Sequence, residues 1–246
     1  MTIAHFIMQG KGGVGKSLVA SILIQYLLKQ RLEVSGCDTD PVNSSLARYR
    51  SLNVTVIDIM EGEDIDPGRF DQLVHHIDSS PAEAHMVIDV GASCFVSLCA
   101  YLKKYGTFEL LRDQGHTTYI HTVITGGVNL LETLNNFCSL ANNFSVPIIV
   151  WLNHFFGEIK IGGERFEDFK IHRELADSIR GIIEMPNLGT SLFARDFADM
   201  QARYDTFDDS LKNPKVFLTN RSRLFHIWKD YRQAIGAIGL VPILED

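Results

Sequence analysis

An octapeptide near the N-terminus carries the residues with the clearest chemistry. Residues 10–17 read Gly-Lys-Gly-Gly-Val-Gly-Lys-Ser, which fits the phosphate-binding pattern G-x-x-x-x-G-K-[ST]. Glycines let the backbone approach a triphosphate closely because they have no Cβ atom. The N–H groups of such a loop and of the helix that follows it face the anion. We therefore expect Lys16 to reach phosphate oxygens and Ser17 to ligate Mg²⁺.

Aspartates follow two later apolar segments. Asp38 and Asp40 lie in the string Cys-Asp-Thr-Asp-Pro at 37–41, and Asp89 ends the string Val-Ile-Asp at 87–89. A carboxylate at the end of a buried strand is typical of sites that hold Mg²⁺ through water. Asp and Pro also favour plain turns, which is the alternative for the first string. The position of these aspartates relative to the phosphate loop favours the functional reading.

Alternating strand-like and helix-like segments position these residues. Strands are expected at 3–8, 33–37, 54–59, 85–90, 118–124, 147–152 and 182–184. Helices are expected at 17–29, 70–77, 97–105, 130–143 and over most of 193–238. Strands separated by helices imply a mainly parallel sheet with helices on both faces, the α/β architecture of a P-loop nucleotide-binding domain. Ligands of such folds bind at the carboxyl ends of the strands, where the loop and the aspartates lie.

Length and composition indicate one soluble domain over residues 1–246. The chain is 46% hydrophobic and 22% charged, and it has no linker-like stretch or internal repeat. The N-terminus has no basic region or cleavable apolar region, and no apolar run approaches the ~20 residues of a membrane span. The four cysteines and nine histidines show no metal-ligand spacing, which indicates a reducing compartment. We therefore expect a cytoplasmic protein without a membrane span.

The charge pattern bears on partners. A net charge of −7 argues against a protein that coats a polyanion, so DNA contact is possible but not favoured. One basic segment, residues 212–232, has six Lys/Arg against one acid. Around it, apolar residues recur at helical spacing, which fits either a membrane-surface helix or a core stripe. The acidic end at 245–246 suits anionic lipid poorly and favours the core. The stripe comprises Leu224, Ile227, Trp228, Tyr231 and Ile235.

A second lysine at position 11 makes the loop resemble that of the deviant Walker A ATPases, which include the MinD, ParA, ArsA and nitrogenase iron-protein groups. The resemblance implies a homodimer in the ATP state, in which Lys11 reaches the partner's nucleotide. It also implies that Asp40 orients the attacking water and that Gly91 offers its N–H in a second switch. The implied catalytic residues are Lys11, Lys16 and Asp40, and the implied Mg²⁺ ligands are Ser17, Asp38 and Asp89. The implied ATP contacts are Gly10, Lys11, Gly12, Gly13, Val14, Gly15, Lys16, Ser17 and Leu18, with Asn153 and Pro186 near the adenine.

Further strings are similar to the TraL group of conjugal transfer proteins within this family. They lie at 8–13, 38–43, 88–93, 113–116, 121–127, 150–153 and 195–197. This similarity implies an accessory ATPase of plasmid transfer with protein partners in the transfer apparatus, slow without an activator. A ParA-like partition ATPase that binds DNA as a dimer and a MinD-like scaffold remain alternatives. An iron–sulfur carrier is disfavoured because no cysteine lies between Cys37 and Cys94.

Overall fold

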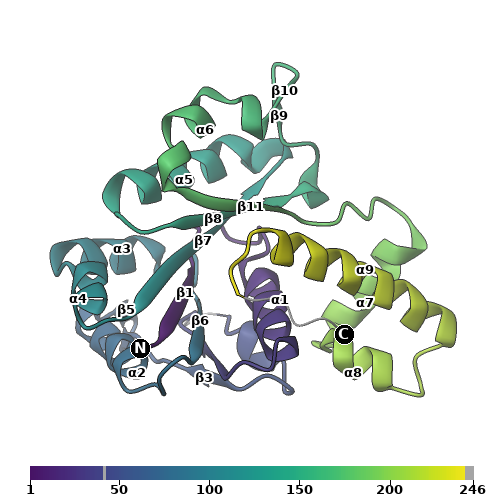
Figure 1. Ribbon diagram of the computed structural model, residues 1–246, viewed down its shortest axis with the longest axis horizontal. Coiled ribbons are helices and arrows are strands. Elements are labelled where there is room, and N and C mark those ends of the chain that lie inside the picture. Colours follow the sequence, from purple (N-terminus) through teal and green to yellow (C-terminus); the bar gives the residue numbers. More distant parts are fainter. Residues whose placement is uncertain (41–42, 242–246) are drawn as a thin grey trace.

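A central parallel sheet lies between two layers of helices (Figure 1). The structure is a computed structural model that describes residues 1–40 and 43–241. The seven strands have the order β11-β8-β7-β1-β6-β2-β3, and every pairing in this sheet is parallel. The predicted α/β architecture is therefore confirmed.

The strands of this sheet follow the sequence pattern closely. They are β1 (Ile3–Ile7), β2 (Val34–Asp38), β3 (Val54–Val56), β6 (His85–Asp89), β7 (Thr117–Thr125), β8 (Ile148–Asn153) and β11 (Ile179–Glu184). The strand predicted at 54–59 is too long, because the Asp58 carboxylate accepts a hydrogen bond from the Met60 backbone N–H (3.0 Å) and turns the chain. Two short hairpins lie outside the sheet: β4 (Met60–Glu61) with β5 (Asp64–Ile65), and β9 (Lys160–Ile161) with β10 (Glu164–Arg165).

The helices divide between the two faces of the sheet. Packed on one face are α1 (Lys16–Lys29), α7 (Leu192–Ala202), α8 (Phe207–Lys212) and α9 (Leu218–Ala237). Packed on the other are α2 (Phe70–Asp78), α3 (Phe95–Lys104), α4 (Thr107–Asp113), α5 (Leu130–Asn143) and α6 (Lys170–Glu174). In Figure 1, α5 and α6 lie above β8 and β11, whereas α1 and α9 lie below them. Successive strand residues alternate between the two cores, as a pleated strand requires.

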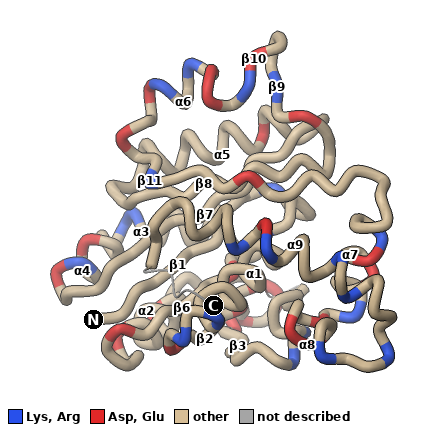
Figure 2. Tube along the Cα trace, turned by 45° about the vertical axis from the view of Figure 1, so that its right-hand side comes forward, with Lys and Arg blue, Asp and Glu red and all other residues tan. Residues whose placement is uncertain are grey.

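Aromatic stacking and one ion pair hold the C-terminal helices together. The Phe207 ring stacks on Phe197 and Trp228, with centroid distances of 5.8 and 4.9 Å. Buried Asp196 of α7 pairs with Arg223 of α9. Figure 2 shows both acidic and basic residues on α7 and α8.

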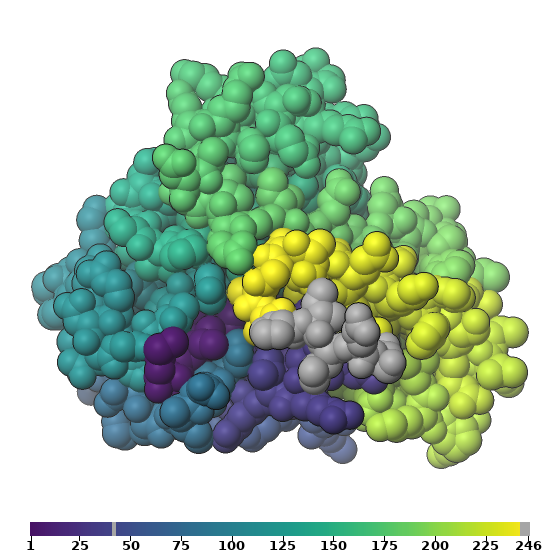
Figure 3. Space-filling model, viewed as in Figure 1, coloured from purple at the N-terminus to yellow at the C-terminus, as the bar shows by residue number. Residues whose placement is uncertain are grey.

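The apolar stripe of α9 is part of the core, as predicted. All five of its members are buried in the cluster that includes α1. In Figure 3, α9 (yellow) lies beside α1 on the face shown, and the two helices are in contact. Among the described residues, no helix combines the length and the apolar character that a bilayer span needs. The acidic end at 245–246 lies outside the described residues.

A row of buried histidines crosses the sheet on the α1 side. The Trp151 indole N–H donates to His121 Nδ1 (3.0 Å), His121 Nε2 lies 3.1 Å from His5 Nδ1, and His5 Nε2 lies 2.9 Å from His85 Nδ1. Because an indole nitrogen only donates, His121 accepts at Nδ1 and, when neutral, donates at Nε2 to His5, which in turn donates at Nε2 to His85 Nδ1. Burial lowers the pKa of His121 to about 3 and that of His85 to about 4, so the row is neutral.

Candidate functional site

The phosphate loop turns at the carboxyl edge of the sheet, between β1 and α1. Gly13 and Gly15 have left-handed backbones, with φ of 75° and 104°, which favour glycine. A Cβ on Gly10 would lie 2.9 Å from the Phe95 ring and 3.1 Å from the Asn136 amide nitrogen. The loop conformation therefore needs glycine at these three positions.

The first turn of α1 is open to an anion. Its N-cap residue, Gly15, supplies no capping side chain, and the turn contains no acid. The positive end of a helix dipole without a capping acid suits a phosphate group. Lys16 is buried beside this turn, and its ammonium donates to the Lys11 carbonyl at 3.1 Å. Burial lowers the pKa of Lys16, while nearby Asp89 and Asp40 act in the opposite direction.

The surroundings of the Asp89 carboxyl group show whether the residues present could hold a metal ion. Asp89 is 2% exposed, and its Oδ1 has no hydrogen-bond partner in the part of the chain that the structure describes. Burial raises the pKa of Asp89 to about 7, and a hydrogen bond from Ser17 opposes this shift. An unpartnered carboxylate oxygen beside a hydroxyl suits a hard cation such as Mg²⁺. The structure thus brings together Ser17 and Asp89, two of the three predicted ligands.

Asp38, the third predicted ligand, is occupied by backbone donors. Its Oδ1 accepts from the Asp40 N–H (3.0 Å), and its Oδ2 accepts from the N–H groups of Leu46 (3.0 Å) and Ala47 (3.1 Å). Burial raises the pKa of Asp38, and these three hydrogen bonds act against that shift. In this arrangement Asp38 links the end of β2 to the backbones of Asp40, Leu46 and Ala47.

Asp40 packs directly on the segment that follows β6. A Cβ on Gly91 would lie 2.8 Å from Asp40 Cα, so this approach is possible only with glycine. Thr39 and Cys94 join the same two segments, because Cys94 Sγ lies 3.7 Å from Thr39 Oγ1 and 3.6 Å from the Thr39 carbonyl oxygen. The two predicted switches are thus in contact. Pro41 and Val42 of the first switch lie outside the described residues.

The cysteines show no sign of metal chemistry. Burial raises the pKa of Cys94 to about 11, so its sulfur stays a thiol at neutral pH. Cys37 and Cys94 are buried, and Cys99 and Cys138 are half-buried. Within residues 1–40 and 43–241, no group of three or more His, Cys, Asp or Glu side chains is arranged to hold a metal.

Lys11 contacts its own chain. Its ammonium lies 2.9 Å from the Glu132 carboxylate in the first turn of α5. Its backbone N–H donates to Gln9 Oε1 (3.4 Å), which also accepts from the Asn136 amide. Gln9, Glu132 and Asn136 were not predicted from the sequence as site residues. The available signal for Glu132 was its position as an acid in the first turn of the helix predicted at 130–143, directly after a predicted strand.

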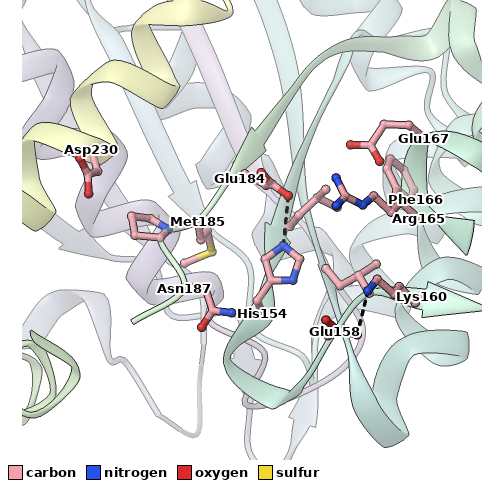
Figure 4. Close-up of a pocket in the computed structure, with 13 residues that line it drawn as sticks. His154, Glu158, Lys160, Arg165, Phe166, Glu167, Glu184, Met185, Asn187 and Asp230 are labelled. Atoms are coloured by element: carbon pink, nitrogen blue, oxygen red, sulfur yellow. Dashed lines mark hydrogen bonds and ion pairs between the residues drawn. The ribbon is translucent and has the colours of Figure 1, made fainter. Parts of the chain in front are cut away.

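The two predicted adenine contacts differ in their surroundings. The amide nitrogen of Asn153 donates to the Val14 carbonyl (3.0 Å) and its Oδ1 accepts from the Phe155 N–H (3.0 Å), so this side chain braces the phosphate loop. Pro186 lines a neighbouring cavity of about 480 Å³ at the ends of β8 and β11 (Figure 4). That volume is in the range of small-molecule sites.

A histidine–carboxylate pair and a lysine–carboxylate ion pair border this cavity. His154 Nε2 lies 3.4 Å from a Glu184 carboxylate oxygen, and the Lys160 ammonium lies 3.0 Å from Glu158, both drawn as dashed lines in Figure 4. Neither pair was predicted from the sequence. His154 directly follows Asn153, and its position at a strand end was the signal available for it.

Comparison with known proteins agrees with this geometry. A profile of the CobQ/CobB/MinD/ParA nucleotide binding domain matches residues 5–225. Protein TraL of Escherichia coli is 40% identical over 226 residues, which cover 91% of this chain and 93% of TraL. The MinD cell division protein of Aquifex aeolicus has a similar fold, with a TM-score of 0.54 at 16% identity over 100% of both chains. The MinC:MinD complex of the same organism gives a TM-score of 0.53 at 15% identity, over 100% of this chain and 99% of the other.

At 15–16% identity the solved structures show the fold alone. The profile match and the TraL similarity both extend over most of the chain, and the phosphate loop lies inside the matched residues. This chain therefore belongs to the CobQ/CobB/MinD/ParA nucleotide-binding family of P-loop ATPases, within which it is similar to TraL.

Proposed function

We propose that this protein is a cytoplasmic, Mg²⁺-dependent ATPase that works as a nucleotide-gated homodimer and serves as an accessory ATPase of conjugative plasmid transfer. The observation that carries the ATPase part is the meeting of Lys16, Ser17 and the unpartnered Asp89 oxygen beside the open end of α1. The identity with TraL supports the role in plasmid transfer.

Each residue of this set has a separate task in the proposal. Lys16 and the α1 N–H groups neutralise phosphate charge, and Ser17 and Asp89 would hold Mg²⁺, which supplies further charge neutralisation when bound. Asp40 orients the attacking water, and its close contact with Gly91 sets the position of its backbone and hence of its carboxylate. This catalysis relies on positioning and electrostatics, so we expect slow turnover until a partner completes the site.

Exposed apolar side chains at the same edge of the sheet support the homodimer. Val96 follows β6, Val128 and Leu131 follow β7, and Phe155 follows β8. Val128 is 99% exposed and Phe155 is 83% exposed. Large apolar residues gathered around one site are typical of a protein contact surface. A second copy docked on this edge would cover them and bring Lys11 close to the opposite nucleotide.

Surface features also bear on the two alternatives, a ParA-like dimer that binds DNA and a MinD-like scaffold that binds a protein partner. In the basic segment 212–232, Lys212 pairs with Asp208 and Arg223 pairs with Asp196, which reduces the charge available to a DNA backbone. Phe217 and Leu218 at the start of α9 are exposed, which favours a dimer whose output is the binding of a protein partner.

Light scattering on a sizing column tests the proposal. The Asp40→Ala variant, which keeps the phosphate loop but lacks the water-orienting carboxylate, is expected to be a dimer with Mg·ATP and a monomer with Mg·ADP. Changing Lys11 to Ala as well should abolish the dimer. A Lys16→Ala variant should lose nucleotide binding in calorimetry.

Opposite results have distinct meanings. An unchanged mass in both nucleotides would refute the gated dimer, and wild-type turnover in Lys16→Ala would refute the phosphate-loop assignment. Pull-downs with purified transfer proteins in ATP and in ADP then separate a partner-binding switch, which retains partners in one nucleotide only, from an ATPase without such an output.

A further inference from the structure

The ion pair between Lys11 and Glu132 has a fixed geometry. The two charged atoms are 2.9 Å apart, and the side chains are 34% and 52% exposed. Glu132 lies in the first turn of α5, where the helix dipole stabilises its negative charge without any lysine. Glu132 thus lies next to Lys11, the partly exposed lysine of the phosphate loop, whereas Lys16 of the same loop is buried.

The backbone of Lys11 is anchored to the same helix. Gln9 is fully buried, and its amide nitrogen donates to the Val123 carbonyl (2.9 Å) and the Thr133 carbonyl (3.3 Å). Its Oε1 accepts from the Lys11 N–H and from the Asn136 amide. Glu132 and Asn136 are four residues apart and therefore share one face of α5. That face sets both the backbone and the side-chain position of Lys11.

The pair also lies at the edge where the second copy is proposed to dock. Val128 and Leu131, both strongly exposed, flank Glu132 at the start of α5. The charge of a lysine that holds a carboxylate of its own chain is already compensated, so it neutralises a phosphate of the partner's nucleotide less well. Full neutralisation of the partner's phosphate therefore favours release of the Glu132 carboxylate when the dimer forms.

We propose that Glu132 is a positioning residue that holds Lys11 in the resting monomer, and that each Lys11 leaves Glu132 when the ATP dimer forms. The inference rests on the proposed function and adds a free-energy threshold for dimer formation, namely the cost of breaking the Lys11–Glu132 pairs. The carboxylate holds the Lys11 ammonium on α5 and sets how much free energy the partner's nucleotide must contribute before the dimer is stable.

The size of the threshold follows from the exposure of the pair. A half-exposed ion pair changes an equilibrium constant by a factor of about 1.4 to 5. A symmetric dimer breaks two such pairs, so the factors multiply. Removing the carboxylate should therefore tighten the ATP dimer about 2- to 30-fold.

Sedimentation equilibrium of the Asp40→Ala protein and its Glu132→Gln derivative, both with Mg·ATP, measures this effect. Glutamine keeps the size of the side chain and removes its charge. The expected result is a dimer dissociation constant about 2- to 30-fold lower in the derivative, with the difference shrinking as salt screens the pair in the parent protein. The matched control is Glu174→Gln, which breaks the Lys170–Glu174 surface pair (3.2 Å) on α6 and should leave the constant unchanged.

The outcomes separate this inference from the proposed function. An equal or weaker dimer in the Glu132→Gln derivative would overturn the role of Glu132 while Lys11→Ala still abolished dimerisation. If Lys11→Ala dimerised as tightly as its parent, both the partner-directed role of Lys11 and the present inference would be wrong. Far-UV circular dichroism confirms that each variant is folded before its constant is compared.

Discussion

Replacing His85 with glutamine should make the protein less sensitive to acid. His85 ends the buried row and accepts at Nδ1 from His5 Nε2 (2.9 Å). A glutamine carbonyl oxygen can accept the same hydrogen bond, so the row keeps its direction. The substitution removes a titrating group and leaves a hydrogen-bond acceptor in its place.

The magnitude follows from the pKa of the buried ring. Burial lowers the pKa of His85 to about 4, whereas an unfolded histidine titrates near ~6.5. The unfolded state therefore binds the proton first, and the stability that the neutral ring contributes is present above pH ~6.5 and is lost as the pH falls. Between about pH 7 and about pH 5 the loss amounts to about 2 kcal/mol of unfolding free energy for His85.

Asp89 acts with the opposite sign over the same interval. Burial raises its pKa to about 7, so protonation on acidification stabilises the folded state by about 2 kcal/mol. The pH dependence of the wild-type protein alone therefore mixes both contributions. The difference between wild type and His85→Gln isolates the histidine, because Asp89 is present in both.

Urea unfolding at about pH 7 and about pH 5, extrapolated linearly to water, measures the effect. The variant should lose about 2 kcal/mol less than the wild type over this interval. His226→Gln replaces an exposed histidine on α9 and serves as the control. An equal loss in wild type and His85→Gln would show that the buried ring does not stay neutral, and the reasoning about the row would fail.

Three further substitutions test individual contacts. Gly91→Ala puts a methyl group 2.8 Å from Asp40 Cα and should lower ATP turnover about 10- to 100-fold, measured by phosphate release. Asn153→Ala removes the hydrogen bond to the Val14 carbonyl and should weaken nucleotide binding about 2- to 10-fold in calorimetry. Phe207→Ala opens a cavity in the stack of the C-terminal helices and should cost about 3–5 kcal/mol of unfolding free energy in urea.

The parts of the fold that the sequence predicted have strong local patterns. The segments that became β1, α1 and β6 combine several apolar residues with a glycine or aspartate signal at one end. The hairpins at 60–65 and 160–165 have strands of two residues, too short to show an alternating pattern. Helix α4 was not predicted because only Tyr105 and the left-handed Gly106 (φ 58°) separate it from α3. So short a connection gives no clear boundary between two helices in the sequence.

In the site, too, residues in local motifs were predicted, whereas contacts between residues far apart in the sequence were not. Lys16, Ser17 and Asp89 were predicted to lie together because parallel strands end at one edge of the sheet, and they do. The bond between Gln9 and Asn136 joins residues 127 positions apart, and no periodicity encodes such a contact. A sequence pattern names the residues of a loop more readily than the partners that hold the loop in place.

The two strand-end aspartates predicted as Mg²⁺ ligands can be ranked by what occupies their oxygens. Both oxygens of Asp38 are engaged by backbone N–H groups, including those of Leu46 and Ala47, whereas Oδ1 of Asp89 has no partner among the described residues. Exchanging a hydrogen bond to a charged group costs about 1.5–3 kcal/mol. If a cation recruited Asp38, the protein would lose that free energy for each backbone N–H that the cation displaced, and the contact of Asp38 with Leu46 and Ala47 would be lost. Asp89 gains a partner for an oxygen whose burial is otherwise uncompensated, so we place Asp89 ahead of Asp38 as the ligand of Mg²⁺.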